Sequence, residues 1–366
     1  MQARQTRHDV VVVGGRVAGA MTAARLAARG RSVLVLESRE RLSGTLSTHF
    51  FRGDGLVRGL AEVGVLEQVL ATGAPPLTCQ YSYSGGGDVP TIGPPQEPGT
   101  AGFCLSVRRE ALDALLASHV SRVPGVTFRT GVKVVDVLRR EGAVAGVRDE
   151  SGDEHFASVV VGADGRRSRV ARLVRANVHE RHPAARVMYY RYVTEWTGPQ
   201  AGCPDGAEFS LLDNEQVYVF PSDRKTACVA LTVGLDRYTE ASSHPEHFFD
   251  TRIKAHHGIW PRLRRSVQRG RIFVGPLQDS VIRQAAGPGW ALVGDAGTYQ
   301  DPWTGFGMDT AARQAEVLAQ TLLPNPAEWN DSYSIARDGV TLERFTATVT
   351  AAPDLSTLVR TRKPTP

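Results

Sequence analysis

Long hydrophobic runs are missing from the 366-residue sequence. No apolar stretch approaches the roughly 20 residues that a membrane-spanning helix needs. The N-terminus is polar up to Asp9, and the apolar run that follows, Val10 to Val13, is too short for the core of a secretory signal. These absences predict a soluble, cytoplasmic protein.

Cysteine is also scarce, with four residues in the whole chain: Cys79, Cys104, Cys203 and Cys228. None of them forms a C-x-x-C pair, and no histidines stand around them at the spacing of a zinc site. Isolated cysteines are usually small core residues. We therefore expect neither a disulfide nor a metal site.

Clusters of basic residues are missing as well, although the formal net charge is +5. Arginine is spread along the sequence, and no run of Lys and Arg interleaved with aromatic residues is present, so nucleic acid is not an expected partner. An anionic dinucleotide would account for the modest basic excess, and so would a solvated, arginine-rich surface. With 42% hydrophobic and 22% charged residues, the composition is that of a globular protein.

The sequence does contain a clear pattern of strands and helices at its N-terminus. Residues 9–13 are typical of a buried parallel strand, and residues 18–29 have apolar positions three and four apart, which predicts a helix. Residues 33–36 form a second buried run. Together these segments predict a βαβ unit of a Rossmann-type fold with a right-handed crossover.

The turn between the first strand and the helix carries a degenerate dinucleotide-binding fingerprint. Gly14 and Gly19 take its first and third glycine positions, and Arg16 stands where the second glycine belongs. Glu37 follows Gly14 by 23 residues (37 − 14), a position from which a carboxylate accepts hydrogen bonds from ribose hydroxyls. A tight turn and a surface glutamate are the alternative, but the order of strand, turn, helix, strand and acid favours a nucleotide site.

A second glycine-and-aspartate turn follows the buried strand at 159–161. It reads Gly-Ala-Asp-Gly and spans Gly162 to Gly165. Taken alone, it is equally explained as an ordinary Asp-Gly turn before a helix that Ser168 caps.

A third turn, Gly294-Asp295, follows the buried strand at 291–293. The segment from Pro302 to Met308 then leads into a helix that starts near Asp309. A helix N-terminus exposes N–H groups that suit an anionic or electron-rich partner. The Asp295 carboxylate can accept a hydrogen bond from a ribityl hydroxyl.

The order of these three motifs resembles that of the group A flavoprotein monooxygenases, the superfamily of para-hydroxybenzoate hydroxylase and the geranylgeranyl reductase-like enzymes. The resemblance covers roughly residues 8–325 and implies non-covalent FAD. The first motif would hold the ADP half, the third motif the ribityl chain, and the segment 302–308 would line the isoalloxazine ring. The cofactor-binding residues that it implies are Gly14, Gly15, Arg16, Val17, Ala18, Gly19, Glu37, Ser38, Arg39, Arg109, Val134, Asp164, Gly165, Gly294, Asp295, Pro302, Gly305, Phe306, Gly307 and Met308.

The sequence departs from the family pattern in two places. Arg16 replaces the middle glycine of the fingerprint, and we expect its guanidinium to help neutralise the pyrophosphate. The stretch 297–299 (Gly-Thr-Tyr) stands where many hydroxylases have Ala-His. His49 and Tyr299 are the catalytic candidates that the resemblance places near the flavin ring, and a packed or capping role for His49 stays open.

We expect an α/β fold class, in which a Rossmann-type FAD-binding domain is interleaved with a smaller α+β substrate-binding domain. Residues 74–102 are rich in proline and glycine, and alternating stretches dominate 176–275, which predicts a mostly antiparallel sheet in the smaller domain. The expected FAD-binding domain comprises residues 1–72, 101–175 and 276–345, the substrate-binding domain comprises 73–100 and 176–275, and residues 346–366 form the C-terminal helix end and tail.

The resemblance implies an NAD(P)H-using monooxygenase. NADPH or NADH would bind transiently as reductant, and a flavin C4a-hydroperoxide formed with molecular oxygen would oxidise an aromatic or polyketide-like small molecule of natural-product biosynthesis. A flavin-dependent double-bond reductase is the alternative, because residues 216–221 resemble an aromatic–Phe-Pro segment of geranylgeranyl reductases. A halogenase is less favoured because the Trp-x-Trp-x-Ile-Pro stretch of that family is absent. A non-catalytic FAD-binding protein, and a monomer or a homodimer, stay open.

Overall fold

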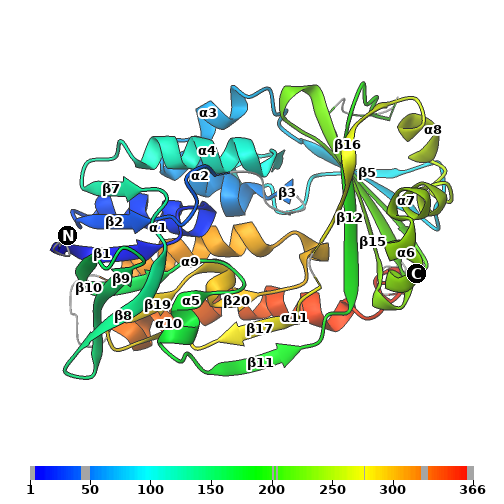
Figure 1. Ribbon diagram of the computed structural model, residues 1–366. Coiled ribbons are helices and arrows are strands. Elements are labelled where there is room, and N and C mark those ends of the chain that lie inside the picture. Colours follow the sequence, from blue (N-terminus) through cyan, green and yellow to red (C-terminus); the bar gives the residue numbers. More distant parts are fainter. Residues whose placement is uncertain are drawn as a thin grey trace.

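The computed structural model describes residues 5–42, 50–199, 202, 205–275, 277–322 and 329–360. Two β-sheets stand at opposite ends of the molecule, and helix α9 (Gly307–Thr321) runs from the first towards the second (Figure 1). The first sheet has eight strands and the second has seven. The predicted α/β fold class with a mostly antiparallel second sheet is confirmed.

The first sheet has a parallel core in the order β19-β10-β1-β2-β7. Its central strand β1 (Gln5–Val13) pairs with β10 on one side and with β2 on the other, so that Val12 lies opposite Val161 and Val35. Valine-rich runs suit this position because both faces of a parallel sheet are buried. The other strands are β2 (Val33–Leu36), β7 (Val126–Arg129), β10 (Glu154–Gly162), β19 (Trp290–Leu292) and the antiparallel β18 (Ala286–Gly287).

Alternate residues of β1 face two different layers, as the period of two of a strand requires. Val10 and Val12 join a core formed with helices, whereas Val11 and Val13 join a core formed with a β-hairpin and a short helix. The helices of the first layer are α1 (Val17–Ala27), α4 (Arg109–Val120), α9 and α10 (Trp329–Gly339). The second layer contains β8 (Val134–Arg140), β9 (Ala143–Asp149) and α5 (Arg169–Leu173).

The second sheet has the order β16-β12-β15-β14-β13-β4-β5, and its pairs are antiparallel except for β4 with β13. Helices cover its outer face, where Tyr189 packs with Phe248 and Phe249. The opposite face is aromatic and includes Tyr190 and Phe220. The elements are β4 (Cys79–Ser84), β5 (Thr91–Gly93), β12 (Arg186–Thr194), β13 (Gly206–Leu212), β14 (Glu215–Pro221), β15 (Thr226–Gly234), β16 (Val267–Val274), α6 (Tyr238–Ser243), α7 (Pro245–Ile253) and α8 (Trp260–Leu263).

Smaller elements connect the two sheets. A three-stranded sheet of β11, β17 and β20 lies beneath them, and β3 pairs with β6 (Figure 1). The bounds are β3 (Phe50–Phe51), β6 (Leu105–Ser106), β11 (Val178–His182), β17 (Ser280–Arg283), β20 (Thr298–Tyr299), α11 (Leu342–Ala351) and α12 (Thr357–Arg360).

Residues 56–72 have a sequence pattern that predicts one helix ending at Gly73, and this prediction is wrong. The chain forms a π-helical turn at Gly53–Val57, then α2 (Arg58–Glu62) and α3 (Leu66–Leu70). Gly64 has φ +78°, a left-handed conformation that ends a helix, so α2 and α3 cannot be continuous.

The expectation that no disulfide forms is also wrong. Cys79 is disulfide-bonded, and the structure describes only this half of the bond. Pairing depends on which distant segments converge, which cysteine spacing along a chain does not reveal. Cys104 and Cys228 are buried and free.

Within the described ranges, no cluster of histidine, cysteine and acidic residues could hold a metal ion. None of the helices in these ranges is long and apolar enough to cross a membrane.

Candidate functional site

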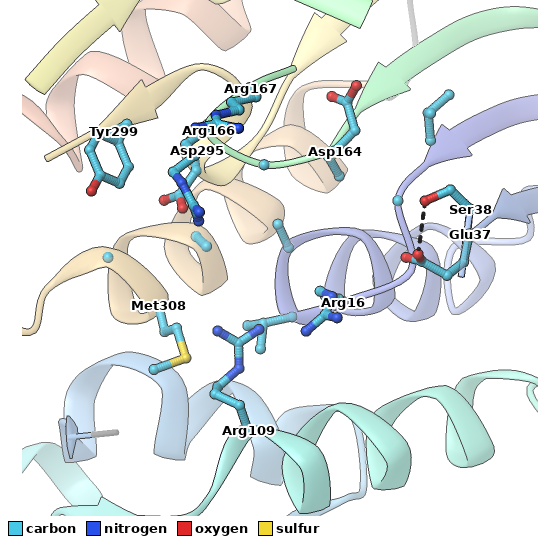
Figure 2. Close-up of a pocket in the computed structure, with 18 of the residues that line it drawn as sticks. Arg16, Glu37, Ser38, Arg109, Asp164, Arg166, Arg167, Asp295, Tyr299 and Met308 are labelled. Carbon is cyan, nitrogen blue, oxygen red and sulfur yellow. Dashed lines mark hydrogen bonds between the residues drawn. The ribbon is translucent and has the colours of Figure 1, made fainter. Parts of the chain in front are cut away.

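A cavity of about 570 Å³ opens where the parallel strands β1, β2 and β10 end. This edge of a parallel sheet is the usual place for a bound nucleotide. The three glycine turns meet there, with Arg16, Asp164 and Asp295 on separate walls (Figure 2). The predicted site residues that line it are Gly14, Arg16, Val17, Ala18, Glu37, Ser38, Arg39, Arg109, Val134, Asp164, Gly165, Asp295, Tyr299, Pro302, Gly305, Gly307 and Met308.

The first motif needs glycine at its two outer positions. Gly14 has φ +103°, and a Cβ there would lie 2.4 Å from the backbone oxygen of Ala163. A Cβ on Gly19 would lie 1.8 Å from the backbone oxygen of Gly14. Side chains at these positions would therefore push apart the turn, α1 and the second motif. Gly15 and Gly19 shape the turn without lining the cavity itself.

Glu37 is tied to the backbone of the first motif. It is buried, its Oε2 accepts a hydrogen bond from the Gly15 N–H at 2.8 Å, and its Oε1 accepts one from the Arg39 N–H at 3.0 Å. Ser38 donates a longer hydrogen bond to Oε1, at 3.4 Å (Figure 2). These contacts fix a carboxylate at the mouth of the turn.

Arg16 and Arg109 approach each other through a shared acid. The Arg16 Nη1 lies 2.7 Å from Asp113 Oδ2, and the Arg109 Nη2 lies 3.0 Å from Asp113 Oδ1. Asp113 is fully buried beneath the cavity, whereas both arginines line it. The shared carboxylate holds two cations side by side, an arrangement that suits a pyrophosphate.

The carboxylate of the second motif is used inside the protein. Asp164 accepts hydrogen bonds from the backbone N–H groups of Arg169 and Val170 at 2.6 and 3.0 Å, and from the Ser168 hydroxyl. Ser168 in turn accepts from Ala171 N and caps α5, as the local pattern predicts. Burial raises the pKa of Asp164, and these hydrogen bonds oppose the shift.

Asp295 points into the cavity from the third motif (Figure 2). Burial raises the pKa of Asp295, and the cations Arg109, Arg166 and Arg283 oppose the shift. Its neighbour Gly294 does not line the cavity: it has φ +63°, and its N–H donates to Gln314 Oε1 at 2.7 Å. A buried acid that faces a cavity is suited to bind hydroxyl groups of a ligand.

An ion-pair network with a buried centre holds the segment that follows. Asp301 caps its start by accepting from the Trp303 N–H at 3.1 Å. Phe306 is not among the residues that line the cavity, and its ring packs against two arginines, with the guanidinium carbons of Arg52 and Arg344 at 4.0 and 5.2 Å from its centroid. Arg52 in turn pairs with Asp309 at the start of α9, at 3.1 Å.

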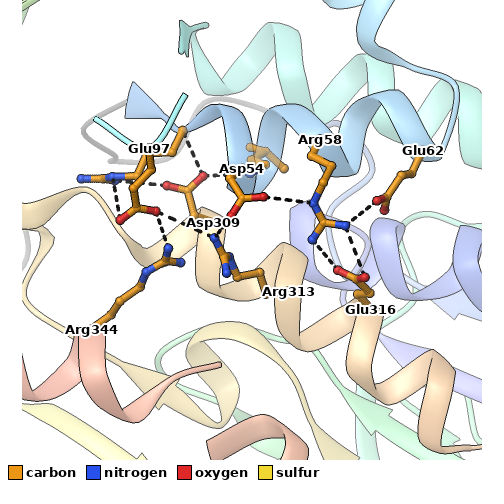
Figure 3. Close-up of polar contacts among 10 residues, drawn as sticks. Asp54, Arg58, Glu62, Glu97, Asp309, Arg313, Glu316 and Arg344 are labelled. Carbon is orange, nitrogen blue, oxygen red and sulfur yellow. Dashed lines mark hydrogen bonds and ion pairs between the residues drawn. The ribbon is translucent and has the colours of Figure 1, made fainter. Parts of the chain in front are cut away.

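The network continues along α9 to the neighbouring segments (Figure 3). Glu97 pairs with Arg344, Arg313 pairs with Asp54 at 2.8 Å, and Glu316 pairs with Arg58 at 2.7 Å. These ion pairs tie α9, which directly follows the segment 302–308, to neighbouring parts of the chain.

Of the two catalytic candidates, only Tyr299 lies in the described part of the chain. Tyr299 lines the cavity, and burial together with Asp295 and Asp301 raises the pKa of its phenol. It therefore stays a neutral hydroxyl at physiological pH and can donate a hydrogen bond. His49 lies outside the described residues.

Several residues that line the cavity are additional to the predicted set. Several arginines that follow the second motif line the cavity, and the consecutive arginines after Gly165 could have indicated this from the sequence. Met188 and Tyr190 of β12 come from the second sheet, and Gly275 directly follows β16; the sequence indicates that aromatic residues of this sheet border the cavity but not which of them face it. These additional lining residues include Arg166, Arg167, Arg169, Arg172, Lys133, Met188, Tyr190, Gly275 and Gln300.

Comparison with known proteins agrees with this geometry. A family model described as "FAD binding domain" matches residues 7–335. The chain is 29% identical over 328 residues to digeranylgeranylglycerophospholipid reductase 2 of Methanothermobacter thermautotrophicus, covering 86% of this chain and 77% of that protein. It is 27% identical over 348 residues to monooxygenase CTB7 of Cercospora beticola, covering 89% and 81%.

Among solved structures, the fold matches that of pqsL, a probable FAD-dependent monooxygenase from Pseudomonas aeruginosa. The TM-score is 0.75 at 20% identity, and the match covers 95% of each chain. The chain therefore belongs to the FAD-binding family of group A flavoproteins and is an FAD-dependent oxidoreductase.

Proposed function

We propose that the protein is an NAD(P)H-using monooxygenase that hydroxylates or otherwise oxidises a compact aromatic molecule. The observation that carries this proposal is that one cavity joins the three glycine motifs to the aromatic inner face of the second sheet, through Met188 and Tyr190. Bound FAD supplies the hydride and oxygen chemistry that side chains cannot provide.

The described residues fit an FAD molecule. Among them, seven arginines and Lys133 line the cavity against three carboxylates, Glu37, Asp164 and Asp295, which suits an anionic cofactor. In our proposal Glu37, with Ser38 and Arg39, binds the adenosine ribose, and Val134 lies at the adenine end. Arg16 and Arg109 offset the pyrophosphate, Asp295 accepts from the ribityl chain, and residues 302–308 lie along the ring.

The aromatic face of the second sheet would exclude water from the reacting atoms. Tyr190 stacks on Phe273 with ring centroids 5.1 Å apart, and Phe50 stacks on Phe220 at 4.8 Å. Of these rings, Tyr190 lines the cavity, and the other three pack behind the inner face. Water exclusion protects reactive intermediates from hydrolysis and proton leakage.

A double-bond reductase is the second candidate, supported by the 29% identity to the archaeal reductase. Two observations favour a compact substrate instead. Tyr218 of the segment 216–221 is committed inside the protein, since its hydroxyl donates to the Trp303 backbone oxygen at 2.7 Å. The rings of Phe220 and its neighbours pack against one another and fill the inner face, where a long isoprenoid chain would need open space.

The experiment is stopped-flow reduction of the FAD-loaded protein by NADPH and by NADH without oxygen, followed by mixing with oxygen in the presence of candidate aromatics. The proposal expects nicotinamide-driven reduction and a product that contains one atom of labelled oxygen. Anaerobic turnover of an alkene would establish the reductase, and a product that contains bromine when bromide is supplied would establish a halogenase.

A further inference from the structure

One buried side chain in the cavity lacks the partners that its chemistry requires. Gln300 is 6% exposed, and both its Oε1 and its Nε2 have no hydrogen-bond partner. An amide has two donors and an acceptor, and burying them unpaired costs free energy that native proteins avoid. The missing partners are therefore expected to come from a ligand.

The fold holds Gln300 firmly in this position. On one side Tyr299 pairs with Val281 in the small sheet, and on the other the Asp301 N–H donates to Ser280 Oγ at 3.0 Å. The backbone therefore cannot turn the amide out towards solvent without breaking these contacts.

Another buried glutamine, Gln314, shows the hydrogen bonds of an amide that has a structural role in this fold. Gln314 is fully buried, its Oε1 accepts from the Gly294 N–H at 2.7 Å, and its Nε2 donates to Thr341 Oγ1 at 2.9 Å. Both ends of Gln314 are satisfied, whereas neither end of Gln300, which lines the cavity, has a partner. A packing role does not explain this difference.

The surroundings of Gln300 indicate which ligand supplies the partners. It lies in the same cavity as Met188, Tyr190 and Gly275, which come from the second sheet. The charged residues at the dinucleotide motifs suit the cofactor's phosphates and hydroxyls, whereas Met188, Tyr190 and Gly275 carry no charge. We propose that Gln300 is a specificity-determining residue, whose amide pairs with a substrate group that both donates and accepts a hydrogen bond.

This inference rests on the proposed function only in placing an aromatic substrate beside the flavin. It narrows the substrate class to compact aromatics that carry a carboxamide, lactam or hydroxyl group. A purely hydrocarbon substrate would leave the amide unpaired, and a site built for hydrogen bonding rejects such analogues strongly.

Three probes of equal shape separate the hydrogen-bonding roles: benzamide, acetophenone and α-methylstyrene. Benzamide donates and accepts, acetophenone only accepts, and α-methylstyrene does neither. We expect the FAD-loaded wild type to bind benzamide roughly tenfold more tightly than acetophenone, measured from the difference spectrum of the flavin, and α-methylstyrene most weakly. In Gln300→Met these differences should disappear.

Stability and FAD affinity distinguish a ligand role from a structural one. Because Gln300 has no partners to lose, Gln300→Met should keep or raise the melting temperature of the substrate-free protein and should keep the FAD dissociation constant. The matched control is Gln284→Met. Gln284 donates to the Ala286 backbone oxygen at 2.9 Å, so this variant should lower the melting temperature and leave the probe differences intact.

Each other outcome overturns the proposal. A weaker FAD affinity in Gln300→Met would assign the amide to the flavin, and a loss of stability like that of Gln284→Met would assign it to the fold. Equal binding of the three probes by the wild type, or no binding, would also contradict it. Because the readout is binding, a failure here is distinct from a failure of the proposed oxygenation, which turnover measures.

Discussion

Replacing Asp309 by asparagine removes one charge from the centre of the network that holds the segment 302–308 (Figure 3). Asp309 is fully buried, and its Oδ1 accepts from the backbone N–H groups of Arg52 and Leu56 at 3.1 and 2.9 Å. Its Oδ2 accepts from Arg52 Nη1 at 3.1 Å. Both oxygens accept from N–H donors, so the ionised carboxylate is the form that fits.

The size of the loss in unfolding free energy follows from the buried charge that the substitution leaves without its carboxylate partner. Asparagine can keep the two backbone contacts, but its amide group then meets Arg52 donor to donor. Arg52 is 2% exposed and cannot lose its proton, and its next carboxylate, Glu97, is 4.0 Å away. Breaking a buried pair in this way costs about 3–5 kcal/mol of unfolding free energy.

The effect should also reach the cofactor. Arg52 donates to the Thr304 backbone oxygen at 2.8 Å and lies over the Phe306 ring, so its displacement loosens the segment 302–308. We expect the FAD dissociation constant to rise on the order of tenfold, about 1.4 kcal/mol.

Urea unfolding at a fixed, saturating FAD concentration measures the first effect, and quenching of FAD fluorescence measures the second. Glu316→Gln is the matched control. Glu316 lies on the same helix as Asp309 and pairs with Arg58 of α2, but the side chains of Glu316 and Arg58 are 23% and 29% exposed. That variant should lose about 1 kcal/mol or less. If Asp309→Asn costs no more than the control, the network does not support the site as we describe.

Two other substitutions test separate parts of the site. Glu37→Gln removes the charge that accepts hydrogen bonds from the Gly15 and Arg39 N–H groups. FAD affinity, measured by fluorescence titration, should fall about ten- to a hundredfold. The control Ser38→Ala loses only a 3.4 Å contact and should change the affinity little. Burial raises the pKa of Asp301 to about 6 from its ordinary 3.8, so its favourable contribution to stability is complete below pH 3.8 and is lost as the pH rises through about 6. Asp301→Asn keeps the cap on Trp303 and should be more stable than the wild type at pH 8 by up to about 3 kcal/mol. Urea unfolding should show that this difference in stability shrinks towards pH 4. An equal difference at both pH values would contradict this reasoning.

The parallel core and the cofactor turns could be predicted from the sequence because their signals are local. The runs at Val10–Val13 and 159–161 are apolar on both faces, which only a buried parallel strand needs. Gly19 is required by a close approach within its own motif, since a Cβ there would lie 1.8 Å from the backbone oxygen of Gly14, and Gly14 is required by its φ of +103° in the turn. The apolar spacing of residues 109–120 likewise predicts a helix, and α4 has the same bounds in the structure.

Features that depend on contacts between distant segments could not be predicted. Met188 and Tyr190 reach the cavity only because the second sheet stands against the first, and strand alternation alone does not say which face that is. The packing of the Phe306 ring against Arg52 and Arg344 has no signal in its own segment, because these arginines come from positions more than 200 residues apart. The polarity of Gln300 is visible in the sequence, whereas its missing partners are visible only in the fold.

A crystal structure of the FAD-loaded protein tests the central claim most directly. The account predicts one FAD along the cavity, with the Asp295 carboxylate within about 3.5 Å of a ribityl hydroxyl and the Glu37 carboxylate equally close to the adenosine ribose. The Arg16 and Arg109 guanidiniums should face the pyrophosphate. FAD bound elsewhere, or bound here with Asp295 and Glu37 both out of hydrogen-bonding reach, would contradict it.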